Sequence, residues 1–142
     1  MKFRIRTLAG GVVPSYETKG AVAFDLSASA KTTIPARSLG LIPTGLVVEV
    51  PDGYALLLCA RSSTPKKKGL LIPHGVGIID QDYCGPEDEL FVQYYNFTDA
   101  DVTVAAGERC AQGLLVRVGK ADFCVVDELA ATSRGGFGST GN

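Results

Sequence analysis

The stretch LVVEVPDGYALLLC, residues 46–59, consists of two apolar runs joined by the turn sequence Pro51-Asp52-Gly53. Apolar runs of this length, rich in β-branched residues and bounded by Pro, Asp and Gly, are typical of strands. We therefore expect strands over Leu46–Val50 and Tyr54–Cys59, separated by a tight turn.

The same pattern continues in both directions along the chain. Lys2–Arg6 alternates polar and apolar side chains, as a half-buried strand does. Turn sequences such as Gly85-Pro86 and Ala106-Gly107 separate many of the other candidates. Further strands are expected over Ala21–Leu26, Lys31–Ile34, Leu39–Pro43, Val76–Ile79, Leu90–Asn96, Val102–Val104, Arg109–Val118 and Phe123–Val126.

Helical patterns are scarce. Thr64–Lys68 predicts one short helical turn, opened by Thr64 with Pro65 at its first position. Evenly spaced short strands with intervening turns favour an all-β sandwich, jelly roll or barrel. We expect one domain over residues 1–131, followed from about Thr132 by a glycine-rich arm over residues 132–142.

Composition narrows the function classes. The 142 residues are 46% hydrophobic and 20% charged, which suits one globular domain with a core. A net charge of −1 predicts no general attraction to nucleic acid or to an anionic membrane, so any phosphate affinity must be local. No apolar run approaches membrane-spanning length and residues 1–4 carry no signal-like segment, so a cytoplasmic location is expected.

The four cysteines, Cys59, Cys84, Cys110 and Cys124, are widely spaced and form no C-x-x-C pair. This spacing argues against a disulfide framework or a zinc site. We expect reduced thiols packed as small hydrophobic side chains.

The arm residues Arg134–Asn142 hold four glycines, one guanidinium, one aromatic ring and two hydroxyls. Alone, such a segment cannot bury enough surface to offset its ordering entropy, and a disordered end is the alternative interpretation. Arg134 can bind phosphate oxygens with two hydrogen bonds, and Phe137 offers a ring face to a base. We therefore favour an arm that orders over a phosphorylated ligand.

Two interior clusters could bind anions or cations. Asp25 interrupts the apolar segment Ala23–Ala28, either as a solvent-facing or turn-capping residue or as a carboxylate aimed at a hydrated metal. Arg61, Ser62 and Ser63 follow an apolar strand, where they suit either an anion site or a polar loop with a helix cap. Lys66–Lys68 is more typical of a solvated charge run.

Residues 74–85 form the strongest interior signal, because an apolar strand leads directly into Asp80, Asp82 and Tyr83. Carboxylates at i and i+2 lie on one face of a strand, as a catalytic or metal pair or simply as a polar turn. His74 is the only histidine, either a general base or a loop residue.

The fourth cluster is Gly107–Gln112, where polar side chains enter an apolar strand. A buried network between Glu108 and Arg109 is the structural interpretation for that pair. Gln112 is the better candidate for a ligand contact, because its amide donates to phosphate without adding charge.

Five segments, Ala23–Ala28, Ala60–Ser63, Gly77–Gly85, Gly107–Gln112 and Arg134–Gly141, together resemble the ordered motifs of the trimeric dUTPase family. The resemblance implies a jelly-roll or β-clip-type distorted barrel, a homotrimer with shared active sites, and Mg²⁺. It also implies hydrolysis of dUTP to dUMP and pyrophosphate, which limits uracil in DNA and supplies dUMP for thymidylate synthesis.

The resemblance assigns roles by position. Asp80 matches the carboxylate that orients the attacking water, and Asp25 would act on Mg²⁺ through water. The phosphates would be held by Arg61, Ser62, Ser63, Gln112, Arg134, Ser139 and Thr140.

The base and the sugar would be read by a second group. Uracil would meet the backbone of His74, Gly77, Ile78 and Ile79, whose N–H and C=O groups suit uracil and mismatch cytosine. Tyr83 would pack on the deoxyribose and exclude a 2′-hydroxyl, and Phe137 would stack on uracil.

The chain departs from the family pattern at Phe24, His74, Cys84 and the longer loop Pro86–Asp88.

Three other functions are compatible with the same sequence. The related dCTP deaminases, including bifunctional members, need a glutamate where this chain has Gln93, which cannot shuttle a proton. A broader pyrimidine dNTP pyrophosphatase and a purely structural β module are the others.

Overall fold

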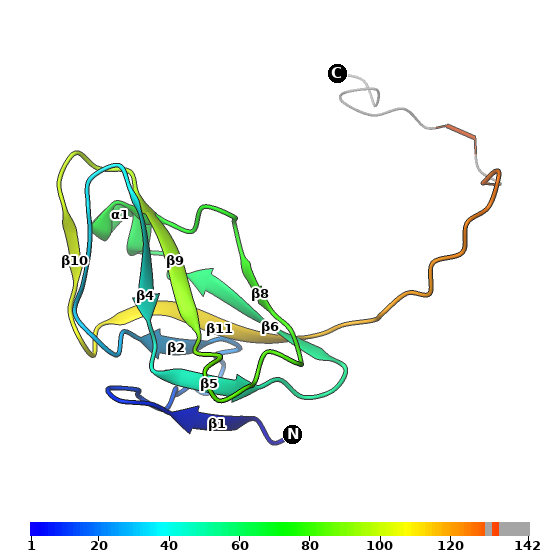
Figure 1. Ribbon diagram of the computed structural model, residues 1–142, viewed down its shortest axis with the longest axis horizontal. Coiled ribbons are helices and arrows are strands. Elements are labelled where there is room, and N and C mark those ends of the chain that lie inside the picture. The colour runs from blue at the N-terminus through cyan, green and yellow to red at the C-terminus, as the bar shows by residue number, and fades with distance from the viewer. Residues whose placement is uncertain (130–131, 134–142) are drawn as a thin grey trace.

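The computed structural model describes residues 1–129 and 132–133 (Figure 1). Within them the chain is almost entirely β. The elements are β1 (Arg4–Thr7), β2 (Phe24–Ser27), β3 (Thr32–Ile34), β4 (Leu39–Pro43), β5 (Leu46–Glu49), β6 (Tyr54–Ala60), α1 (Thr64–Lys68), β7 (Leu70–Leu71), β8 (Gly77–Ile79), β9 (Phe91–Asn96), β10 (Val102–Val104) and β11 (Arg109–Arg117).

The strands form antiparallel sheets that pack around one core. The largest has the order β2-β11-β6-β8, a second has the order β4-β9-β7, and β1-β5 and β10-β3 form two-stranded pairs. In Figure 1, β4 and β9 rise from the layer that contains β2, β5, β6 and β11. The predicted all-β, jelly-roll-type class is confirmed, although the described strands do not close into a barrel.

The core is built from the inward-facing positions of the strands. Leu56 in β6, Val92 and Tyr94 in β9, and Leu46 in β5 are almost completely buried. The Tyr94 hydroxyl donates to the Cys110 carbonyl oxygen at 2.7 Å, which satisfies a polar group inside the core. This buried pair joins the β4-β9-β7 sheet to β11.

Helix α1 has the predicted bounds, but its N-cap is Ser63 rather than Thr64, and no side-chain hydrogen bond caps it. Pro65 lies in the first turn, where its missing N–H costs nothing. Gly69 ends the helix in the left-handed conformation, with φ of 65°. No helix in the described part of the chain is long and apolar enough to cross a membrane.

One strand is missing from the predictions, and one predicted strand is wrong. The pair Leu70–Leu71 forms β7 against β9 but is too short to be recognised in the sequence. Phe123–Val126 forms no strand, and Figure 1 shows this orange segment running away from the body. The side chain of Phe123 is 97% exposed, because nothing in the described part of this chain pairs with the segment.

Candidate active site

Three of the sequence clusters meet at one end of the β2-β11-β6-β8 sheet. In the strand register, Gln112 of β11 lies opposite Asp25 of β2 on one side and Cys59 of β6 on the other. Arg61 follows directly after β6, at the same end of the sheet. The fold therefore brings together Asp25, Arg61 and Gln112, which are far apart in the sequence.

Asp25 is the centre of this cluster. Its residue is only 7% exposed, and its two carboxylate oxygens accept from two different guanidinium groups. Arg61 Nε donates to Oδ1 at 3.1 Å, and Arg109 Nη1 donates to Oδ2 at 3.0 Å. A buried carboxylate that is paired in this way orients its cationic partners. Because Arg61 uses Nε for Asp25, its two terminal nitrogens stay available to an anion.

A β-bulge explains why Arg109 reaches Asp25. The register shifts between Arg109 and Ala111, so that Arg109 lies opposite Ser27 while Gln112 lies opposite Asp25. Residues three apart on a regular strand face opposite sides, and one extra residue returns them to the same side. Local sequence carries no signal for this bulge, so sequence patterns alone do not reveal the Asp25–Arg109 pair.

The predicted Glu108–Arg109 network is wrong. Glu108 pairs instead with Lys68, with Nζ and Oε1 2.7 Å apart, and Arg109 pairs with Asp25 and Glu17. Glu108 lies in the turn before β11 and its carboxylate accepts from the Ala105 N–H, whereas Arg109 is the first residue of the strand, so the two side chains point apart. Burial alone raises the pKa of the Glu108 carboxyl, but bonds from Lys68 and from the Ala105 N–H hold it below its ordinary value.

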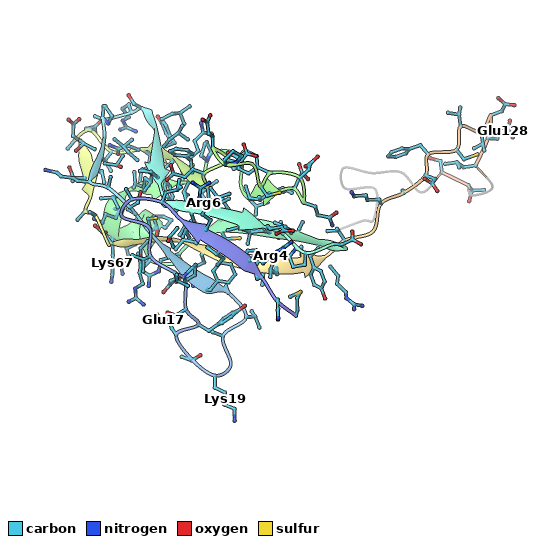
Figure 2. The ribbon with its side chains drawn as sticks, turned by 60° about the horizontal axis from the view of Figure 1, so that its bottom comes forward. Arg4, Arg6, Glu17, Lys19, Lys67 and Glu128 are labelled. Atoms are coloured by element: carbon cyan, nitrogen blue, oxygen red, sulfur yellow. The ribbon has the colours of Figure 1, made fainter. Side chains whose placement is uncertain are left out.

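The Lys68 ammonium also donates to the Thr103 carbonyl oxygen at 3.1 Å, so this lysine is not part of a purely solvated run. Lys67 remains exposed, and Figure 2 shows it at the surface of the body. Figure 2 also shows Glu17, the second partner of Arg109, on a projecting loop whose far end carries Lys19.

A recess of about 280 Å³ opens at this end of the sheet. Four cationic side chains line it together with one carboxylate, which makes it suitable for an anion with several charges. The lining residues are Arg61, Ser63, Thr64, Lys67, Lys68, Glu108 and Arg109. Ser62 is exposed beside it, and Gln112 is half-buried.

Asp80 lies in a different place. Ile79, the last residue of β8, pairs with Leu56 near the beginning of β6, and Asp80 follows it. Asp80 and Asp82 both line a recess of about 560 Å³ that also includes Tyr54 and Lys120. The Gln81 side chain between them donates to the Tyr54 carbonyl oxygen at 3.0 Å, which secures this turn to β6.

Strand β6 separates the two regions. Asp80 lies beside the beginning of β6, and Arg61 follows the end of the same strand, five to six residues further on. This number of residues spans about 20 Å along an extended strand. A single chain therefore does not bring the predicted water-orienting carboxylate to the predicted phosphate-binding residues.

The backbone that is predicted to read uracil lies on an edge strand. In the described chain β8 pairs with β6 alone, so its other edge presents unpaired backbone groups. Gly77 approaches β6 closely, since a Cβ there would lie 3.1 Å from Leu58 Cβ. His74 Nδ1 lies 2.9 Å from the Val76 carbonyl oxygen, which favours a proton on Nδ1.

A smaller recess, of about 240 Å³, lies beside this edge. His74, Gly77, Ile78 and Ile79, the four residues predicted to meet uracil, all line it, together with Leu58, Ile72, Phe91, Val92 and Gln93. Tyr83 follows at the end of the same segment, and its hydroxyl donates to the Glu89 carbonyl oxygen at 3.0 Å.

Phe24, a departure from the family pattern, is accommodated by Gly113. These two residues are opposite each other in β2 and β11, and a Cβ at position 113 would lie 2.3 Å from Phe24 Cε2. The aromatic ring thus occupies space that any side chain at position 113 would need. This packing supports the strand that carries Asp25.

The predicted arm contacts Arg134, Phe137, Ser139 and Thr140 lie outside the described residues.

Known proteins of one family share this fold. A family model described as dUTPase matches residues 10–141. A deoxyuridine 5′-triphosphate nucleotidohydrolase of Helicobacter pylori strain P12 is 36% identical over 144 residues, covering 99% of this chain and 97% of the relative.

Solved structures give the same result. The dUTPase from Streptococcus mutans has 35% identity and a TM-score of 0.78, and the match covers 84% of this chain and 98% of that one. A mutant dUTPase from phage phi11 of S. aureus, described with a structural Mg(II) ion, shares the fold at 21% identity, with a TM-score of 0.80 over 90% of this chain and 98% of that one. The chain belongs to the dUTPase family and is a hydrolase.

Proposed function

We propose that the chain builds its active site from the Asp80 region of one subunit and the Asp25–Arg61–Gln112 cluster of another. As a dUTPase, it hydrolyses dUTP to dUMP. The observation that carries the proposal is the separation of about 20 Å between Asp80 and Arg61 along β6. A triphosphate cannot be held at one end of this strand and attacked at the other, so the two ends must come from different chains.

Exposed apolar surface supports a homotrimer. The outer face of the β4-β9-β7 sheet presents Leu39, Leu41, Leu71 and Phe91, all of them exposed large hydrophobic residues. Contiguous apolar faces of this kind mark interfaces, because water contact with them is unfavourable. Identical copies related by a closed rotation would cover this face and bring the two halves of each site together.

The C-terminal segment supports the same assembly. Phe123 and Val125 are exposed on a segment that leaves the body of its own chain. An apolar extended segment gains stability by lying on a neighbouring subunit. We assign residues 1–131 to the domain, with the segment after β11 as its extended end, and residues 132–142 to an arm that closes over a neighbour's site. In this arm Arg134, Ser139 and Thr140 bind phosphates and Phe137 stacks on uracil.

At the site, Asp80 orients a water molecule for attack on the α-phosphorus and accepts its proton. Arg61, Ser62, Ser63 and Gln112 hold the phosphate oxygens, and the pyrophosphate leaves from the side opposite the water. Most of the rate enhancement then comes from alignment and from neutralisation of charge in the cationic recess. Asp25 contributes by holding the Arg61 guanidinium in place.

Mg²⁺ fits this site only through water. Among the described residues there is no group of three His, Cys, Asp or Glu side chains that could hold a metal ion. Both Asp25 oxygens already accept from arginines, and each oxygen keeps a second lone pair for a metal-bound water. The ion would therefore be held mainly by the triphosphate, with Asp25 contacting its waters, and it would supply additional charge neutralisation. The phage phi11 dUTPase, which shares the fold, is described with a structural Mg(II) ion, and this is consistent with Mg²⁺ as the metal of the present protein.

Uracil selection follows from the edge of β8. Its backbone can offer an N–H to O4 and a C=O to N3–H, whereas cytosine would leave both groups unpaired. Tyr83 packs on the deoxyribose and leaves no room for a 2′-hydroxyl.

The dCTP deaminase alternative is not favoured, because the family is dUTPase and Gln93 carries no carboxyl to transfer protons. We place the reaction in the cytoplasm, where it limits uracil in DNA and supplies dUMP for thymidylate synthesis.

Turnover of dUTP, dTTP, dCTP and UTP with Mg²⁺ tests this function, with pyrophosphate and ammonia measured separately. We expect dUMP and pyrophosphate from dUTP and little product from the other three nucleotides. Asp80→Asn should lower kcat by about 10²- to 10⁴-fold, while binding of a non-hydrolysable dUTP analogue is retained. Comparable pyrophosphate release from dCTP or dTTP would instead identify a broader pyrimidine nucleotide hydrolase.

A further inference from the structure

The loop that follows Tyr83 is closed by its own hydrogen bonds. The Gly85 N–H donates to Asp88 Oδ2 at 2.7 Å, and the Asp88 N–H donates back to the Gly85 carbonyl oxygen at 3.1 Å. A Cβ at position 85 would lie 2.9 Å from Asp88 Oδ2, so the turn closes tightly around a glycine. Pro86–Asp88, the longer loop noted in the sequence, forms this turn.

The closed turn brings Glu89 back onto Tyr83. The Tyr83 hydroxyl donates to the Glu89 carbonyl oxygen at 3.0 Å, six residues further along the chain. Tyr83 is 38% exposed, so packing alone constrains its ring weakly. The hydrogen bond at the far end of the ring, together with the backbone at the near end, therefore determines the plane of the ring.

Glu89 itself is held firmly to the core. Its Oε1 accepts from the Gly45 N–H at 2.7 Å, in the turn between β4 and β5. The next residue, Leu90, is fully buried, donates to the Leu46 carbonyl oxygen at 2.8 Å and accepts from the Thr44 hydroxyl at 2.7 Å. The carbonyl that receives the Tyr83 hydroxyl is thus a fixed point.

We propose that Glu89 is a positioning residue for sugar selection: its carboxylate, bonded to Gly45, fixes the carbonyl group that holds Tyr83 against the deoxyribose. The inference rests on the proposed role of Tyr83 in excluding a 2′-hydroxyl. If Tyr83 can tilt, a ribose fits more easily, and discrimination between dUTP and UTP falls.

Steady-state kinetics with dUTP and UTP test the inference in four single variants. Glu89→Ala removes the bond to Gly45, and Tyr83→Phe removes the hydroxyl without removing the ring. Glu89→Gln keeps an oxygen acceptor for the Gly45 N–H. Glu87→Ala is the matched control, because its side chain takes part in no hydrogen bond found among the described residues.

Glu89→Ala and Tyr83→Phe should each lower the ratio of kcat/KM for dUTP to kcat/KM for UTP by about three- to tenfold, the range for one neutral hydrogen bond. The change should lie in the KM for UTP, and in Glu89→Ala kcat for dUTP should stay nearly unchanged. Glu89→Gln and Glu87→Ala should keep the wild-type ratio. The double variant Tyr83→Phe/Glu89→Ala should lose no more than either single variant, because both act on the same contact.

A lower melting temperature in Glu89→Ala with an unchanged selectivity ratio would reduce Glu89 to a structural role and overturn the inference. Should Glu89→Ala not fold, Glu89→Asp takes its place, because its shorter side chain draws the carboxylate away from the Gly45 N–H. Tyr83→Ala distinguishes the role of Tyr83 from that of Glu89. A retained ratio in Tyr83→Ala would refute the assignment of Tyr83 to the sugar, whereas a reduced ratio there with no effect of Glu89→Ala would refute only the role of Glu89.

Discussion

Asp80 and Arg61 lie beside opposite ends of strand β6. Asp80 follows Ile79, which pairs with Leu56 near the start of β6, and Arg61 follows Ala60, where β6 ends. The distance of about 20 Å between these levels exceeds the reach of any side-chain rearrangement. The proposed chemistry therefore requires that several chains assemble.

Mixing two inactive variants tests this requirement directly. Asp80→Asn and Arg61→Ala should each be inactive alone, because every site then lacks one essential group. In an equal random mixture, about half of the sites receive an intact Asp80, and about half of those also receive an intact Arg61 from the neighbouring chain. About a quarter of wild-type activity should therefore return. The measurement is dUTP turnover after the two chains are refolded together.

Wild type refolded with Asp80→Asn is the control for losses during refolding and should give about half of the wild-type activity, whereas mixed assemblies detected by their mass show that subunits have exchanged. Exchange without any recovery in the mixture of the two variants would show that each site lies within one chain.

Asp25→Asn should weaken phosphate binding more than it slows chemistry. The buried carboxylate accepts from both Arg61 and Arg109, and an amide has only one acceptor oxygen for the two guanidinium groups. We expect a rise in KM of about tenfold and a loss of about 2 kcal/mol in the free energy of unfolding, measured by turnover and by urea titration. Glu17→Gln removes only the half-exposed Glu17–Arg109 pair and should cost no more than about 0.5 kcal/mol. Equal effects of the two variants would contradict a special role for Asp25.

Gly113→Ala should destabilise the protein by about 2 kcal/mol, because the new methyl group would overlap the Phe24 ring. Phe24→Leu makes room beside position 113, so the double variant should be more stable than the sum of the two single effects predicts. Urea unfolding of the four proteins gives this coupling. Strictly additive losses would mean that the two residues do not share the space.

Thiol reactivity should follow burial. Cys84 and Cys124 are exposed, whereas Cys110 is buried, and burial raises the pKa of its thiol to about 12. A thiol reagent at a pH of about 8 should label Cys84 and Cys124 rapidly and Cys110 only after unfolding. Rapid modification of Cys110 in the folded protein, detected by peptide mass, would contradict the described packing.

The same thiol makes stability depend on pH. The unfolded state loses the Cys110 proton near a pH of about 8.5 to 9, while the folded state keeps it to about pH 12. The stabilisation is complete below the unfolded pKa and is lost as pH rises towards 12. At a pH of about 10 the loss should be about 1–2 kcal/mol relative to about pH 8. Cys110→Ala should show a smaller loss over this range; an identical loss would assign the effect to other groups.

Local signals were sufficient for most of the strands. Leu39–Pro43 and Val102–Val104 have the predicted bounds, because β-branched and apolar runs bounded by turn residues specify extended backbone without help from distant residues. The order of the clusters also carried the family resemblance, which the comparisons confirm. Phe123–Val126 shows the limit of this reasoning, since its strand-like pattern finds no neighbouring strand in its own described chain.

The sequence by itself determined the strand-forming segments, the residue types available for chemistry and, through their order, the enzyme family. Only the tertiary structure decided which of them meet. The bulge before Ala111 places Arg109 on Asp25, and the pairing of β8 with β6 places Asp80 far from Arg61. Register depends on contacts between strands that are distant in sequence, and a shift of one residue turns every side chain to the other face, so no local pattern determines it.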